Sequence, residues 1–460
     1  MTAADATDAA DRAAVDAAEA ADTAATEAAD TAADATDGES SLWRNRDFRR
    51  FFAGQFVTNA GDSLYTVAVL WLVFELSGST VLTGIANALL LLPWLLQMLA
   101  GPVVDRLPLK PVLVGSQAVQ GVVVLALPLA AATRNLSVGV ILAVIPALTL
   151  ATLVMTPMQA TLVPRIVDER RLSKANSSLA TVTLGLDMVF DALGGAVIAV
   201  FGATTLFLVD SATFAVAGLL FAGIAVPSES AGENDGGGDE SPLDAYVDDL
   251  RDGIDVLRGT AFVELVGLTA VANLATGVTL AILPAFGDGL GGPAVYGLLL
   301  GALGVGRMVG SVVAPSLERV SYGRLLLVGN LLAACCWFAA VAAPSPALTV
   351  VLFGLAWVPA GVSGVLTATL NQTVFPTELL GRVSSIKGTA SGATLPLGSL
   401  IGGVVAELLG TTTTMGLAGF GFGFTGLYIL VRPRLRRLPS VVDADPAAFD
   451  VAIPAEYEGE

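Results

Sequence analysis

Long apolar runs recur along most of this chain, separated by short polar segments. The runs are 20 to 27 residues long, and a helix that rises 1.5 Å per residue crosses a hydrocarbon core about 30 Å thick over that length. The pattern therefore predicts an all-α membrane protein with twelve transmembrane helices, six in each half of the chain. The predicted spans are 51–76, 81–104, 111–132, 138–161, 175–201 and 204–226, then 262–286, 294–315, 322–343, 346–371, 385–410 and 412–431.

Polar segments divide the chain into five parts. Residues 1–42 are rich in Ala, Asp, Thr and Glu and have no apolar stripe, which predicts an acidic, disordered cytosolic tail. An acidic cytosolic linker with a short amphipathic helix, 228–259, separates an N-terminal six-helix bundle, 43–227, from a C-terminal one, 260–437. A second acidic cytosolic tail follows at 438–460.

The two halves resemble each other in sequence. Residues 158–164 align with 370–376 at an offset of 212, and residues 190–195 align with 398–403 at an offset of 208. Related halves are a feature of transporters, whose ligand site lies between them. We therefore expect two pseudo-symmetric bundles around a central cavity.

The basic residues predict the orientation, because Lys and Arg stay on the cytoplasmic side of a membrane. With both termini inside, 21 of the 23 basic residues fall in cytoplasmic segments. Arg134 is the one in an external loop, and Arg307 lies inside a span. We expect a multi-pass protein of the cell membrane with both termini cytoplasmic.

Composition agrees with this interpretation. Hydrophobic residues make up 54% and charged residues 14%, and the mean hydropathy of +0.74 is too high for a soluble globular protein. The net charge of −18 comes from the aqueous segments, which hold 27 of the 41 acidic residues. Nucleic acid is excluded as a partner, since it needs a basic face. Acidic, lysine-poor aqueous segments further suggest a salt-rich, halophile-like cell interior.

Residue types also exclude most enzyme chemistry. The chain has no histidine, and its two cysteines are the adjacent Cys335 and Cys336, whose side chains diverge on a helix. A Ser/His/Asp arrangement and a His-liganded metal are therefore excluded, and no Gly-x-x-x-x-Gly-Lys-Ser/Thr loop is present. We expect a protein that is not an enzyme, with no cofactor and no metal site.

A charged motif lies between the second and third spans. It reads Gly101-Pro-Val-Val-Asp105-Arg106-Leu-Pro-Leu-Lys110, and its glycine, acid and bases could form a conformational latch between bundles. The alternative is an ordinary positive-inside turn. With this motif, the spans and the repeat, residues 45–437 resemble the major facilitator superfamily.

Two further stretches refine the resemblance. Trp43-Arg-Asn-Arg-Asp47-Phe-Arg-Arg-Phe-Phe, followed by Gly61-Asp62, resembles the branch that contains the enterobactin and macrolide exporters. The resemblance implies that Asp105 and Arg106 favour the outward-open state through charge and helix-dipole contacts. The exporter signature of the fifth helix is matched only by Gly194 and Gly195, so the direction of transport stays open.

Four charged residues fall near the middle of predicted spans, where a lone ion costs at least about 2.5 kcal/mol. They form our candidate site for proton coupling, or a central polar site, with Asp62 and Asp191 expected to matter most; the alternative is a static polar bridge. We expect Glu75, Asp210, Glu264 and Glu407 to lie at the membrane interfaces. The candidate charges are Asp62, Asp187, Asp191 and Arg307.

Polar and aromatic residues on the presumed inner faces could contact a substrate, although each could equally join two helices or anchor at an interface. The candidates for the substrate cavity are Gln55, Asn59, Trp94, Gln97, Asn273, Asn371 and Gln372, with Trp337 and Trp357 also considered.

Together these features predict a monomeric secondary transporter that works by alternating access in membrane lipid. We expect proton-coupled efflux of an amphiphilic small molecule. One alternative is an importer or a sodium-coupled carrier of the same fold. An alternative of another class is a non-transporting membrane receptor or scaffold.

Overall fold

The computed structural model describes residues 42–92, 108–225, 254 and 256–451, and these are almost entirely helical. Within this part, nine helices are long and apolar enough to cross a membrane, and three shorter apolar helices accompany them. The predicted all-α membrane fold is confirmed, whereas the count of twelve stays a prediction. The tail at 1–41, the second half of the second predicted span and nearly all of the predicted linker helix lie outside the described residues.

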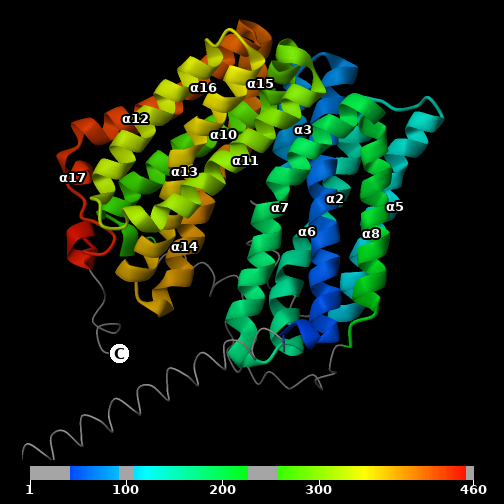
Figure 1. The fold of residues 1–460 in the computed structure, drawn as a ribbon, viewed down its shortest axis with the longest axis horizontal. Coiled ribbons are helices and arrows are strands. Elements are labelled where there is room, and N and C mark those ends of the chain that lie inside the picture. Colours follow the sequence, from blue (N-terminus) through cyan, green and yellow to red (C-terminus); the bar gives the residue numbers. More distant parts are fainter. Residues whose placement is uncertain (1–41, 93–107, 226–253, 255, 452–460) are drawn as a thin grey trace, which may run out of the picture.

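The helices of each half pack against one another, forming two bundles side by side (Figure 1). The first contains α2 (Arg46–Ser77), α3 (Thr80–Leu90), α5 (Leu109–Ala132), α6 (Val138–Ile166), α7 (Leu172–Phe201) and α8 (Ala203–Ala222). The second contains α10 (Ala261–Gly291), α11 (Pro293–Val313), α12 (Tyr322–Val341), α13 (Pro346–Val374), α14 (Thr377–Gly392), α15 (Thr394–Leu409), α16 (Thr411–Val431) and α17 (Pro433–Arg436). Single 3-10 turns occur at Glu169–Arg171, Ala314–Leu317 and Pro446–Phe449.

Short polar residues and glycines determine where several helices begin and end. The Asn45 side chain caps α2 by accepting hydrogen bonds from the backbone N–H groups of Asp47 and Phe48, at 3.0 and 3.1 Å. Gly78 ends the same helix in the left-handed conformation, with φ 65°. These signals let α2 stop and α3 turn back within three residues, so the two helices become antiparallel neighbours.

Helix ends reveal the repeat more sharply than the sequence does. Ser137 and Ser345 cap α6 and α13 in the same extended conformation, and Gly202 and Gly410 make equivalent turns with φ 79° and 86°. All of these pairs are 208 residues apart, as predicted for residues 190–195. The bounds of α6 and α13 also differ by 208 residues at both ends, four fewer than the offset of 212 predicted from residues 158–164.

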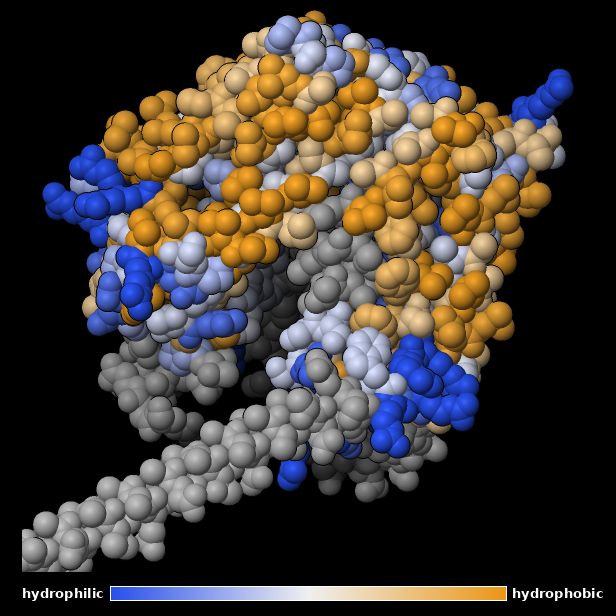
Figure 2. Space-filling view, viewed as in Figure 1, coloured by the Kyte–Doolittle hydropathy of each residue, from blue (hydrophilic) through white to orange (hydrophobic). Residues whose placement is uncertain are grey.

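Large apolar side chains cover much of both bundles on the face seen in Figure 2. Leu219 and Leu408 are each 76% exposed, as expected for side chains that face lipid. A further group of apolar residues is buried where the two bundles meet and within each of them.

The chain after α17 packs beneath the second bundle. Phe449 is fully buried and stacks on Phe262 of α10, with ring centroids 5.2 Å apart. The Arg434 guanidinium donates to Asp450 Oδ2 at 2.8 Å and to the Gly259 carbonyl oxygen at 2.8 Å. Thus residues 438–451, the first part of the predicted acidic tail, form a packed strap.

Candidate functional site

The two bundles touch at one end, where two pairs of helices cross closely. Gly195 of α7 lies against Gly297 of α11, so close that a Cβ on Gly195 would be 2.5 Å from the Gly297 Cα atom. Gly403 of α15 lies in the same way against the backbone at Thr80, the first residue of α3. Small residues permit such approach between membrane helices, so Gly195 and Gly403 have a packing role in these contacts.

Hydrogen bonds reinforce the contact between α3 and α15. The Asn87 amide donates to Ser399 Oγ at 2.8 Å, and Thr80 Oγ1 donates to the Gly403 carbonyl oxygen at 2.8 Å. Glu407 Oε2 accepts from the Thr80 backbone N–H at 3.1 Å. We call this end of the molecule, with its contacts at Gly195 and Gly403, the gate end.

At the opposite end the bundles stand apart, and the surface is hollowed between them (Figure 2). We call this the basic end, because α2 and α12 begin there with Arg46 and Arg324, and α16 ends there before Arg432. Arg134 lies instead in the turn between α5 and α6 at the gate end. The described parts of the two bundles therefore meet at the gate end and stand apart at the basic end.

A second cavity, inside the first bundle, contains the predicted residue Asp62. Its volume is about 160 Å³, several times the roughly 30 Å³ that a water molecule occupies in the liquid. Seven of its ten lining residues have polar side chains, although it lies among apolar helices. The lining residues are Asp62, Tyr65, Thr66, Leu90, Gln120, Leu148, Thr149, Thr152, Asp210 and Phe214.

Asp210 corrects our sequence-based prediction. We expected it at a membrane interface, but it is completely buried and faces the same cavity as Asp62. Its Oδ1 atom accepts from Thr213 Oγ1 at 3.3 Å, whereas its Oδ2 atom has no hydrogen-bond partner among the described residues. The Tyr65 hydroxyl, which lines the same cavity, is likewise buried with no partner in the described part of the chain.

Close packing of α2 and α8 explains how Asp210 becomes buried. A Cβ at Gly61, next to Asp62, would collide with Asp210 Oδ1 and Thr213 Oγ1. On its other side α8 is held to α5 by Ser211 Oγ, which donates to the Gly121 carbonyl oxygen at 3.0 Å. The one signal of this site in the sequence is the polar group Asp210, Ser211 and Thr213 within an apolar run.

The other predicted charges lie apart from this cavity. Asp191 of α7 accepts a hydrogen bond from Ser63 Oγ at 2.5 Å, so that Ser63 connects α2 to α7 while the neighbouring Asp62 faces the cavity. Arg307 of α11 is exposed, belongs to the other bundle, and forms no ion pair within the described part of the chain. The side chain of Asp187 lies outside the described residues.

Three of the four residues of the predicted latch are outside the part of the chain that the structure describes. Gly101, Asp105 and Arg106 lie outside the described residues. Lys110 is described, and its ammonium group donates to the Ile224 carbonyl oxygen at 2.8 Å, joining the start of α5 to the chain after α8. This contact lies within the first bundle, so Lys110 does not join the two bundles here.

The predicted cavity residues divide into several groups. Gln55 is buried, and its backbone carbonyl accepts from the half-buried Asn59 at 2.8 Å. Asn273 donates to the Ser391 carbonyl oxygen at 2.9 Å, which joins α10 to α14. Gln372 is exposed, and Trp94 and Gln97 lie outside the described residues.

Asn371 lies in an unexpected environment. Its side-chain oxygen accepts from the ammonium group of Lys387, a residue we expected in a cytoplasmic segment but which is only 9% exposed. The Lys387 Nζ atom also lies 4.0 Å from the centre of the Phe262 ring, a cation–π contact. This polar contact joins α13 to α14 near the basic end.

The two tryptophans considered as substrate contacts belong to the core of the second bundle. Trp337 is 1% exposed, and its Nε1 atom donates to the Met415 carbonyl oxygen at 2.7 Å. Trp357 is 4% exposed and packs edge-on against Trp337 and Phe422. Both rings therefore have a packing role.

Known proteins resemble this chain in sequence. An uncharacterized MFS-type transporter of Bacillus subtilis, YvqJ, is 23% identical over 410 residues, which cover 86% of this chain and 94% of that protein. The multidrug efflux pump Tap of Mycolicibacterium fortuitum is 27% identical over 396 residues, which cover 82% and 94%.

Solved structures share the fold at low sequence identity. The nucleoside transporter NupG matches with a TM-score of 0.63 and 12% identity over 83% of this chain and 98% of that one. An inward-facing bacterial homologue of the lysosomal transporter Spinster matches with a TM-score of 0.62 and 13% identity over 90% and 99%. These likenesses support the two-bundle fold.

The sequence model of the transmembrane secretion effector family matches residues 39–452, nearly the whole chain. Together with the apolar helices, the two bundles and the related transporters, this match confirms the predicted resemblance. The chain is a multi-pass membrane transporter of the major facilitator superfamily, and it belongs to the transmembrane secretion effector family.

Proposed function

We propose that this transporter exports amphiphilic small molecules in exchange for protons, by alternating access between its two bundles. The basic end faces the cytoplasm in this proposal, as the positive-inside rule requires, so the hollow between the bundles opens to the cytosol. Likeness to a multidrug efflux pump supports the direction of transport. Both termini then lie in the cytoplasm, and one chain encloses the substrate path.

The observation that carries the proton-coupling proposal is the shared cavity of Asp62 and Asp210. Two carboxylates that lie close together in an apolar bundle repel each other, and an uncompensated charge there costs at least about 2.5 kcal/mol. A proton bound by either carboxylate removes most of that repulsion. The open Oδ2 atom of Asp210 and the Tyr65 hydroxyl provide the hydrogen-bonding groups for this proton or for a water molecule that carries it.

Coupling to the gate follows from the order of residues along α2. Asp62 faces the cavity, and the next residue, Ser63, donates to Asp191 of α7. Asp191 lies one helical turn before Gly195, the gate contact. A shift of α2 when the cavity gains or loses a proton is thus transmitted to α7, which closes the gate end.

The test is uphill transport in vesicles. Purified protein in liposomes is given a proton gradient, and the movement of ethidium and other fluorescent amphiphiles is followed. Asp62→Asn and Asp210→Asn preserve side-chain size but remove the charge, so each should abolish gradient-driven accumulation while exchange of substrate without a gradient continues. The matched control is Asp288→Asn, at an exposed position on α10, which should leave both activities unchanged.

Other outcomes would refute parts of the proposal. Full proton-driven accumulation in both cavity variants removes the pair from coupling. Accumulation driven by sodium but not by protons favours the sodium-coupled carrier, and accumulation in the reverse direction favours an importer. No transport of any probe by the full chain, with correct folding, favours the receptor or scaffold.

A further inference from the structure

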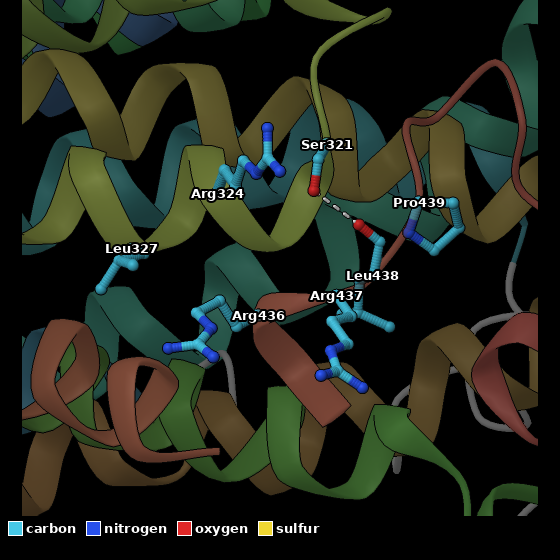
Figure 3. A pocket seen from close by; sticks show the side chains of 7 residues that line it. All are labelled: Ser321, Arg324, Leu327, Arg436, Arg437, Leu438 and Pro439. Atoms are coloured by element: carbon cyan, nitrogen blue, oxygen red, sulfur yellow. Dashed lines mark hydrogen bonds between the residues drawn. The ribbon is translucent and has the colours of Figure 1, made fainter. Parts of the chain in front are cut away.

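A pocket of about 650 Å³ lies at the basic end of the second bundle, away from the path between the bundles. Its walls come from two segments that are distant in sequence: the start of α12 and the chain around the end of α17 (Figure 3). Ser321 Oγ donates to the Leu438 carbonyl oxygen at 2.8 Å, and the Tyr322 backbone N–H donates to the Pro439 carbonyl oxygen at 2.9 Å. These hydrogen bonds hold the two walls together.

Three guanidinium groups line this pocket, and none of the described residues that line it is acidic. Arg324 extends from α12, while Arg436 and Arg437 extend from the other wall (Figure 3). Arg436 donates to the Leu430 carbonyl oxygen at 3.3 Å. None of the three forms an ion pair with another described residue, although Arg432 and Arg434 nearby both pair with Glu264, at 3.5 Å.

An apolar track leads from this pocket along the outer surface. Val328 and Leu332 follow Arg324 at spacings of four on α12, and they are 53% and 57% exposed. On the adjacent α16, Leu427 and Val431 are 57% and 71% exposed. The two faces meet again nearer the gate end, where the rings of Phe338 and Phe420 lie 5.2 Å apart.

From this arrangement we propose that the pocket binds the headgroup of an anionic phospholipid, whose acyl chains lie along α12 and α16. Guanidinium groups bind phosphate oxygens through charge-assisted hydrogen bonds. Because Arg324 is separated from Arg436 and Arg437 across a large pocket, a headgroup with two phosphates contacts all three. The lipid would hold α12 against the strap that follows α17, on the bundle that must move during transport.

Binding of defined lipids to the full chain tests the proposal. Native mass spectrometry of the purified protein measures the affinity for cardiolipin, phosphatidylglycerol and phosphatidylcholine. We expect cardiolipin to bind most tightly and phosphatidylcholine least. Each basic residue near a membrane surface contributes to anionic lipid binding, so the triple variant Arg324→Gln, Arg436→Gln and Arg437→Gln should weaken cardiolipin binding on the order of a hundredfold.

A charge-matched control separates this pocket from general attraction to basic residues. Arg44→Gln, Arg46→Gln and Arg49→Gln remove the same charge from exposed positions at the basic end of the first bundle and should change cardiolipin affinity by less than about twofold. Equal loss in both triple variants, or no loss in the pocket variant, overturns the proposal. The corresponding triple lysine variant retains the charge and should recover part of the affinity, which shows that a loss is not due to misfolding.

A second measurement distinguishes a lipid from free phosphate. Cys335 is exposed on α12, about 16 Å along the helix from Arg324, and takes a fluorophore in a Cys336→Ala background. Cardiolipin with brominated chains should quench the fluorophore, and quenching should be lost in the pocket variant. Inorganic pyrophosphate that displaces cardiolipin at equal concentration would overturn lipid recognition in favour of a phosphate site.

Discussion

The contact between Gly195 and Gly297 predicts that one methyl group can shift the transporter between its states. In Gly195→Ala the new Cβ would lie 2.5 Å from the Gly297 Cα atom and 2.6 Å from the Pro293 carbonyl oxygen. Carbon atoms rest about 3.5 to 4.0 Å apart, so α7 and α11 must separate by about 1 Å. The clash exists only while the gate end is closed.

The size of the shift follows from the cost of overpacking. Forcing extra volume into a well-packed contact costs about 1 to 3 kcal/mol, which changes the ratio of two states by about 5- to 150-fold. Gly115→Ala is the matched control, because a Cβ there meets nothing within 4 Å. It should leave the ratio of states unchanged.

Distances across the gate end measure this ratio. Spin labels on Asn135→Cys and Pro344→Cys, both exposed at the gate end of different bundles, are introduced after Cys335→Ala and Cys336→Ala. Double electron–electron resonance should show a short distance between the two spin labels in the parent protein and a larger population of long distances in Gly195→Ala. If the distance distributions of the parent, Gly195→Ala and Gly115→Ala coincide, the helix contact does not control the gate.

Two other changes have calculable effects. Asn87→Ala removes the hydrogen bond to Ser399, and since such bonds between membrane helices contribute about 0.6 kcal/mol on average, the same spin labels should report a smaller opening than in Gly195→Ala; an equal or larger one would contradict this ranking. Phe449→Ala removes a fully buried ring and should destabilise the strap by about 3 to 5 kcal/mol. Thermal unfolding in detergent should show a clearly lower melting temperature for this variant and little change for Phe420→Ala, whose ring is 60% exposed. A similar decrease of the melting temperature in both variants would show that the strap is not docked.

Helix burial shows why some of the candidate site was predictable and some was not. Asp62 was found from its depth alone, since an acid far inside an apolar run is unusual anywhere in a membrane protein. Asp210 lies about 11 Å into α8, yet its importance depends on the direction in which it points. That direction matters only because α2 and α5 cover this face of α8, and neither contact is written in the local pattern of residues 203–222.

The burial of Lys387 also depends on helix packing and not on the local sequence. Its position near the start of the eleventh predicted span suggested a cytoplasmic residue. Packing of α14 against α10 and α13 instead buries it between Phe262 and Asn371. The shape of the strap after α17 is equally absent from the sequence, where residues 438–451 differ from a polar tail only by scattered apolar residues such as Phe449.

What the sequence determined by itself is what the bilayer demands of any segment: length, apolarity, small residues at close contacts and the distribution of basic residues. These are local properties that depend on each segment and its solvent. Only the tertiary structure decided which face of each helix is covered, that Asp62 meets Asp210 and not Arg307, and that Gly195 meets Gly297. Such pairings join residues far apart in the chain, and their energies arise only when the helices come together.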